Sequence, residues 1–229
     1  MSRAPTKATV GGRTYLALQK KARQEGRPTD ELLQLLALET FLDRLSTSAA
    51  ANDLVLKGGV LLAAYDKRRP TRDVDLSARG LTNSVEDTVE LVRAILEQKR
   101  DDGWNFGSPT GEAIREEDAY SGVRVTVLGT LATARVSFHV DVNFGDPIWP
   151  VPTDVMVPRL LGGTITVRGY SVAMIHAEKI VTAMQRGTAN TRWRDYADIY
   201  LLSGRHTVSS AELSTAIKKV AAHRRASAM

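Results

Sequence analysis

One short segment limits the fold more than any other part of the chain. Residues 54–57 are β-prone and are followed at once by Gly58 and Gly59. An apolar helical stretch covers residues 60–65, and residues 73–77 alternate with the period of two that is typical of a strand. The order strand, glycine turn, helix, strand predicts an α/β fold.

The remaining sequence divides into segments whose hydrophobic periodicity predicts either helix or strand. We expect helices over 13–23, from Thr29 or Asp30 to Leu45, and over 84–100. We expect strands between 104 and 145, including 124–128 and 135–142 joined by a loop at 129–133, then a proline-rich connector over 147–158 and a strand over 164–168. Three helices are expected over 171–186, 191–203 and 210–224.

This layout favours two domains: a mixed α/β (α+β) core over residues 1–165, which includes the N-terminal helices, and a helical C-terminal domain over 166–229. The 229 residues contain no cysteine, which excludes disulfides and cysteine-ligated metal sites. The lack of cysteine fits the cytoplasmic location that we expect, and no run approaches the length of a membrane-spanning helix, so we expect no membrane association. The net charge of +5 permits a polyanionic partner without requiring one.

Two aspartates stand out on the predicted strand at 73–77. Asp73 and Asp75 are two residues apart, so their side chains leave the same face of a strand. Two carboxylates that close repel each other unless a cation neutralises them, and Mg²⁺ prefers such oxygen ligands. The pair therefore indicates a metal site, although a solvated strand edge explains a bare Asp-x-Asp equally simply.

Asp141 is a third candidate ligand. It shares one face of the predicted strand 135–142 with His139, whereas Phe138 and Val140 lie on the other. A strand beside that of Asp73 would bring Asp141 to the same metal site. An ordinary exposed face of an amphipathic strand is the alternative.

The glycine turn has the composition of a phosphate site. Glycines let a phosphate approach the backbone, and the helix that follows offers free N–H groups and the positive end of its dipole. With Lys57, Gly58 and Gly59 upstream of the paired carboxylates, the order suits a nucleoside triphosphate and its metal. Glycine is, however, common in strand-to-helix turns of every kind.

The helical half carries a second charged cluster. Lys179 and Arg186 are seven apart and share a helix face, and Asp195 and Asp198 are three apart and also align. The cations could neutralise charge during phosphoryl transfer, or all four could form interhelical salt bridges. Basic side chains near the C-terminus could follow a phosphate backbone or form a solvated helix end: Lys218, Lys219, His223, Arg224 and Arg225.

Four sequence blocks in this order resemble the AbiEii/AbiGii-type nucleotidyltransferase toxins, including their MenT-like members. The resemblance runs from about residue 35 to about residue 203. The blocks are Leu56-Lys-Gly-Gly59, Arg69-Pro-Thr-Arg-Asp-Val-Asp-Leu76, Val140-Asp-Val-Asn-Phe-Gly-Asp146, and Ala177-Glu-Lys-Ile180 followed by Asn190-Thr-Arg-Trp-Arg-Asp-Tyr-Ala-Asp-Ile199.

The resemblance implies a polymerase-β-like nucleotidyltransferase core and a toxin of a bacterial toxin–antitoxin system that transfers NMP from an NTP to the 3′ end of tRNA. It implies a cognate antitoxin and Mg²⁺ as cofactor. The expected metal ligands are Asp73, Asp75 and Asp141, and Lys179 and Asp195 complete the catalytic set. The expected nucleotide-binding residues are Lys57, Gly58, Gly59, Arg72 and Arg194.

Two other functions remain open from the sequence. The same fold could transfer NMP to a hydroxyl of a protein or a small molecule. A non-catalytic module that binds nucleic acid or a partner is the second alternative, although a degenerate site would be expected to lose several of the residues named above.

Overall fold

The computed structural model describes residues 4–66, 68–115, 121–187 and 191–226. Its helices are α1 (Val10–Glu25), α2 (Thr29–Leu45), α3 (Gly58–Tyr65), α4 (Val85–Leu96), α5 (Val172–Arg186), α6 (Trp193–Ser203) and α7 (Ser210–Ala226). Its strands are β1 (Leu54–Lys57), β2 (Asp73–Ala78), β3 (Trp104–Phe106), β4 (Thr110–Arg115), β5 (Ser121–Leu131), β6 (Ala134–Phe144), β7 (Thr153–Pro158) and β8 (Thr164–Gly169).

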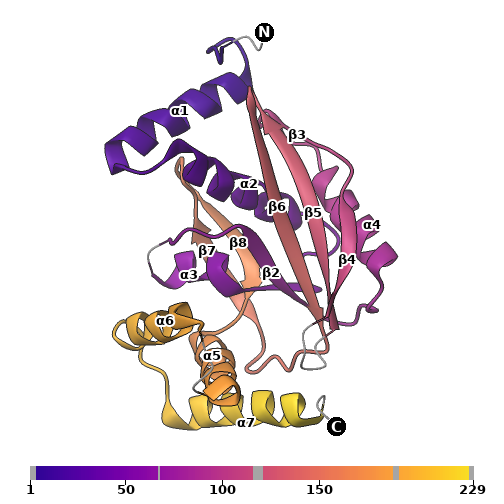
Figure 1. The fold of residues 1–229 in the computed structure, drawn as a ribbon, viewed down its shortest axis with the longest axis vertical. Coiled ribbons are helices and arrows are strands. Elements are labelled where there is room, and N and C mark those ends of the chain that lie inside the picture. Colours follow the sequence, from indigo (N-terminus) through magenta and orange to yellow (C-terminus); the bar gives the residue numbers. More distant parts are fainter. Residues whose placement is uncertain (1–3, 67, 116–120, 188–190, 227–229) are drawn as a thin grey trace.

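The strands form one mixed sheet in the order β3-β5-β6-β2-β1-β8-β7, with β4 paired to β5. The β2–β6 and β1–β8 pairs are parallel, and the other pairs are antiparallel. Helices α5, α6 and α7 gather at the end of the molecule that holds the C-terminus, whereas α1 lies at the opposite end (Figure 1). The observed fold is therefore the predicted mixed α/β core followed by helices.

One face of the sheet is covered by α2, which packs against β6 and β8. The Phe41 ring of α2 meets the Phe138 ring of β6 edge-on, with their centroids 6.3 Å apart. Because side chains alternate along a strand, Val140 and Val142 share this buried face with Phe138. Asp141 and His139 consequently lie on the opposite face of β6.

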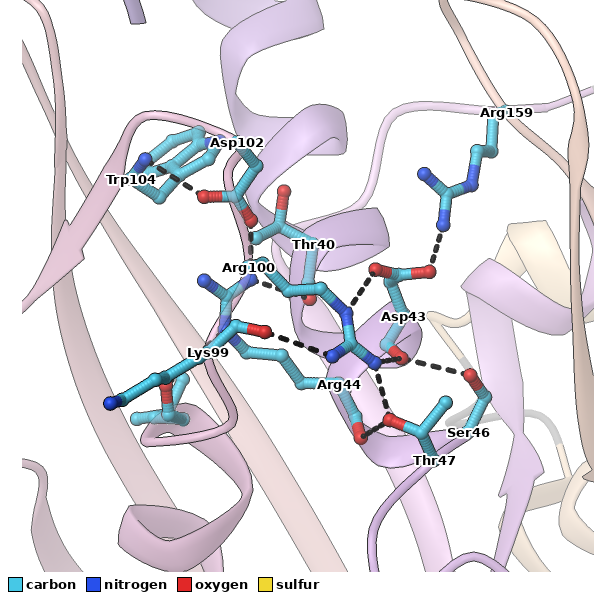
Figure 2. A network of polar contacts seen from close by, with 11 residues as sticks. Thr40, Asp43, Arg44, Ser46, Thr47, Lys99, Arg100, Asp102, Trp104 and Arg159 are labelled. Atoms are coloured by element: carbon cyan, nitrogen blue, oxygen red, sulfur yellow. Dashed lines mark hydrogen bonds and ion pairs between the residues drawn. The ribbon is translucent and has the colours of Figure 1, made fainter. Parts of the chain in front are cut away.

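A group of ion pairs links the C-terminal end of α2 to the loop between α4 and β3 and to the loop between β7 and β8 (Figure 2). We call Asp43, Arg44, Arg100, Asp102 and Arg159 the α2 network. Arg44 lies 2.6 Å from Asp102 and also donates to the Leu96 carbonyl, and Arg100 lies 3.0 Å from Asp43. Arg159, which follows β7, pairs with the other oxygen of Asp43. Every carboxylate of the α2 network thus contacts an arginine.

Most predicted elements are confirmed to within a few residues, and three details are wrong. Pro28, not Thr29 or Asp30, is the N-cap of α2, and no side chain caps that helix. The expected loop at 129–133 is largely strand, because β5 continues to Leu131 and a residue of positive φ, Ala132, makes the tight turn. The expected connector at 147–158 contains β7, whose Val155 and Val157 are buried in alternation.

The expected domain boundary between residues 165 and 166 falls within β8, which pairs with both β7 and β1. The helices begin only at α5. Asn190, part of the fourth sequence block, lies outside the described residues. Within the described ranges, no helix combines the length and apolar character that crossing a membrane requires.

Candidate active site

A row of charged side chains crosses the face of the sheet opposite α2. The strand register aligns Lys57 of β1 with Asp75 of β2, Asp75 with Asp141 of β6, and Asp141 with Arg124 of β5. The same register aligns Asp73 with His139, whose Nδ1 lies 3.0 Å from Asp73 Oδ1. The parallel pairing of β2 with β6 therefore brings the three predicted carboxylates onto one patch.

The glycine turn that follows β1 and begins α3 closes directly over Asp75. Gly58 has a φ of +67°, and a Cβ built there would lie 1.8 Å from Oδ2 of Asp75. The backbone N–H of Gly59 donates a hydrogen bond to the same carboxylate. Gly58 is thus required both by its backbone conformation and by the space that Asp75 takes.

Burial and like charges make Asp75 electrostatically unfavourable as an anion. Burial and the neighbouring carboxylates of Asp141 and Asp73 raise its pKa from 3.8 to about 6, although the Lys57 ammonium and the Gly59 N–H act in the opposite direction. A divalent cation on Asp73 and Asp75 would remove this repulsion, and two carboxylates are a usual protein contribution to a Mg²⁺ site. These two donors fit Mg²⁺.

Asp141 forms an ion pair with Arg124 of β5. Nε and Nη2 of Arg124 donate to its two carboxylate oxygens at 2.8 and 2.7 Å, a bidentate pair. In the described part of the chain, no group of three or more histidine and acidic side chains is arranged to hold a metal ion. A role of Asp141 as third ligand therefore requires Arg124 to move.

A cavity of about 270 Å³ opens beside this patch. Its lining combines residues of the sheet and the glycine turn with residues of α5, α6 and α7. Cations outnumber carboxylates among the side chains that line it. The cations are Lys57, Arg69, Lys179, Arg186, Arg192 and Arg224, and the carboxylates are Asp75, Glu178 and Asp195. A cavity of this charge suits a polyanion such as a triphosphate.

Lys179 of α5 is the centre of one ion-pair cluster in this cavity. Its Nζ lies 2.7 Å from Asp195 Oδ1 and 2.8 Å from Asp198 Oδ2, both of which belong to α6. Arg69, from the loop before β2, contacts the same Asp198 oxygen at 3.1 Å. The interhelical salt bridges weighed from the sequence are therefore present, and they also hold Lys179 at the cavity wall.

Lys57 belongs to a second cluster, which joins the sheet to α5. Its ammonium lies 2.6 Å from Asp146 and 3.7 Å from Glu178. Burial lowers the pKa of Lys57, but the surrounding charges of Glu178, Tyr170 and Asp146 raise it well above its ordinary value. Burial likewise raises the pKa of Glu178. Lys57 is thus a cation with a side chain only 12% exposed and with anionic partners of its own.

The structure brings together most, but not all, of the predicted site residues. Lys57, Gly58, Gly59, Asp75, Lys179 and Asp195 all line the cavity. Asp73 and Asp141 lie on the adjoining patch but are not among the lining residues. Arg72 and Arg194 are both exposed and also lie outside the lining.

Arg69, Arg124 and Arg192 had no role assigned from the sequence, whereas Arg224 was considered there as a phosphate contact or as part of a solvated helix end. Arg69 stands in the block that carries the aspartates, and Arg124 alternates with valines on its strand. Arg224 of α7 lines the cavity and donates to Thr182 and Gln185 of α5 at 2.7 and 2.9 Å. It is not a simple solvated helix end; the side chain of Arg225 lies outside the described set.

Solved structures with a similar fold are nucleotidyltransferases or resemble them. A putative nucleotidyltransferase from H. pylori is 14% identical with a TM-score of 0.52, and the match covers 77% of this chain and 69% of that one. An antigenic nucleotidyltransferase-like protein from Paracoccidioides brasiliensis is 17% identical with a TM-score of 0.48, covering 86% and 90%. At such identities the first likeness shows the fold alone.

The protein JHP933 from Helicobacter pylori is 13% identical with a TM-score of 0.49, and the match covers 74% of this chain. The chain spans 64% of the length of that protein. No curated protein matches the sequence.

The mixed sheet and its paired carboxylates thus define a nucleotidyltransferase fold. Residues 40–228 match the family described as nucleotidyl transferase AbiEii toxin, type IV TA system. The chain belongs to this family.

Proposed function

We propose that this protein is a Mg²⁺-dependent nucleotidyltransferase toxin that transfers NMP from an NTP to the 3′ end of tRNA and thereby blocks translation. The observation that carries the proposal is the register that sets Asp73 and Asp75 beside Asp141, next to a cavity rich in cations. Family membership supports the toxin role and a cognate antitoxin as partner.

In this proposal Asp73 and Asp75 would hold Mg²⁺, which when bound would supply positive charge that stabilises phosphoryl transfer. Lys179 and Arg69 bind the phosphates from the cavity wall, and Asp195 positions Lys179 through the 2.7 Å ion pair.

The 3′-hydroxyl of the acceptor attacks the α-phosphorus in line, so that a new P–O bond forms as the bond to pyrophosphate breaks. Asp141 lies in register beside Asp75, where its carboxylate can accept the proton of the attacking hydroxyl once Arg124 releases one of its oxygens. Arg124 holds both oxygens of Asp141 and orients it. Pyrophosphate leaves past the cations of the cavity.

The test is transfer of label from each of four α-labelled NTPs to total tRNA in the presence of Mg²⁺. Asp73→Asn removes a metal ligand, and Asp154→Asn is the matched control, because Asp154 lies on β7 with a side chain that is 66% exposed. We expect labelled tRNA with the wild type and with the control, and none with Asp73→Asn.

Label on protein or on a small molecule, with none on RNA, would support nucleotidyltransferase activity and contradict tRNA as the acceptor. If calorimetry detects no binding of Mg²⁺–NTP, the proposal that the protein is a nucleotidyltransferase is wrong.

A further inference from the structure

Helix α6 has two opposite faces of very different character. Asp195, Asp198 and Leu202 are buried, and the two aspartates face Lys179. On the other side, Trp193, Tyr196 and Tyr200 are 68%, 49% and 78% exposed. Residues at i, i+3 and i+7 lie along one face of a helix. The three aromatic side chains therefore form one stripe, which we call the aromatic stripe.

Two exposed arginines accompany the aromatic stripe. Arg192 and Arg194 are both exposed, and the Arg194 guanidinium lies 5.8 Å from the centroid of the Trp193 ring. Both acidic residues of α6 form ion pairs with Lys179 on the buried side, and the second oxygen of Asp195 lies 3.4 Å from Nε of Arg192. The exposed face thus offers aromatic rings and guanidinium groups, the combination that binds stacked bases and their phosphates.

The aromatic stripe begins at the rim of the cavity. Arg192 lines the cavity, its side chain is 52% exposed, and Trp193 follows it directly in the chain. From Trp193 to Tyr200 the helix rises about 10 Å. A nucleic-acid strand advances roughly 3.4 Å per nucleotide, so the stripe matches about three stacked bases.

We propose that Trp193, Tyr196 and Tyr200 form a stacking surface for the unpaired bases of a nucleic-acid acceptor whose terminal hydroxyl enters the cavity. This inference rests on the proposed function, because it supplies the binding surface for the acceptor of that reaction. Sequence-independent stacking on the rings holds the strand, and Arg192 and Arg194 bind its phosphates.

The test measures binding without transfer, so it can succeed or fail independently of the proposed reaction. The probe is a dye-labelled single-stranded oligoribonucleotide, titrated in anisotropy experiments without NTP. We expect Trp193→Ala and Tyr200→Ala each to weaken binding about tenfold. Trp193→Phe and Tyr200→Phe, which keep a ring, should retain most of the affinity.

Met184→Ala is the matched control, because Met184 is an apolar side chain of α5 that is 73% exposed outside the aromatic stripe. It should leave the oligonucleotide affinity unchanged. Quenching of tryptophan fluorescence by the oligonucleotide should be largely lost in Trp193→Phe, since Trp104 is only 7% exposed and Trp149 is partly buried against the hydrophobic core. NTP binding should be unchanged in every variant.

Oligonucleotide affinity that does not respond to the alanine variants would overturn the stacking surface, even if tRNA is labelled. The same conclusion follows if Tyr200→Ala abolishes antitoxin binding or self-association and leaves the oligonucleotide affinity intact. Ring-dependent oligonucleotide binding without any transfer to RNA would uphold the stacking surface and contradict the proposed reaction.

Discussion

The carboxylate patch beside the cavity and the α2 network are both built from aspartates and basic side chains, but they arrange them in opposite ways. In the α2 network each carboxylate contacts an arginine, as in the pairs Arg44–Asp102 and Arg100–Asp43. On the patch beside the cavity, Asp75 lies in register with another carboxylate, and its pKa rises to about 6. The first arrangement favours the folded state, and the second keeps anionic ligands close together at some cost in stability.

Four variants or conditions test this contrast, in order of decreasing expected effect. Asp75→Asn should lower NMP transfer by about 10³-fold, because it removes a ligand of the proposed metal and with it charge stabilisation of the reaction. Steady-state transfer assays measure the loss. Circular dichroism should show an intact fold, and a variant that transfers at the wild-type rate would remove Asp75 from the metal site.

Arg44→Ala should lower the free energy of unfolding by about 3 kcal/mol, since Arg44 is 3% exposed and its loss leaves Asp102 without its cation. Urea denaturation measures the change. Arg93→Ala, which breaks an exposed pair with Glu90, should cost less than about 0.5 kcal/mol. If the two variants lower the free energy of unfolding equally, the α2 network stabilises the fold no more than an ordinary surface ion pair does.

Asp75→Asn should stabilise the metal-free protein at pH 7.5 by about 1–3 kcal/mol. Because the folded-state pKa is raised, the folded protein holds the Asp75 proton more tightly than the unfolded chain does. The wild type therefore loses stability as pH rises from about 4 to about 6, and the variant does not. Urea titrations in EDTA from pH 3.5 to 7.5 should show the two proteins converging at the acid end; a constant difference would mean that Asp75 is not the titrating group.

Mg²⁺ should raise the stability of the wild type by about 1 kcal/mol at concentrations several times its dissociation constant, through binding to the folded state alone. Thermal melts without Mg²⁺ and at a Mg²⁺ concentration about ten times the dissociation constant measure the shift. Asp73→Asn and Asp75→Asn should lose the shift, and Asp154→Asn should keep it. A shift that survives in all three variants would place the cation elsewhere.

Local patterns predicted the elements of the fold well, and they predicted contacts between elements poorly. The helices at 171–186 and 210–224 follow from apolar periodicity, which depends on neighbouring residues alone. Strand β7 was missed because Pro152 and Pro158 suggested a connector, although the alternation of Val155 and Val157 could have revealed it. The bidentate partner of Asp141 could not be found, because Arg124 reaches it only through the register of β5 with β6.

The sequence by itself determined that Asp73 and Asp75 share a face, since two residues on one strand do so whatever surrounds them. It also determined the glycine turn at the start of α3, because the φ of +67° at Gly58 strongly favours glycine over residues with a Cβ. These properties follow from the geometry of a few consecutive peptide units.

The tertiary structure decided which charges meet. The parallel register of β2 with β6 sets Asp141 beside Asp75, and the packing of α5 against α6 places Lys179 between Asp195 and Asp198. Such distances depend on strand order and helix packing, and not on the conformation of a few consecutive residues. Burial then fixes the energetics, because only the folded surroundings raise the pKa of Asp75.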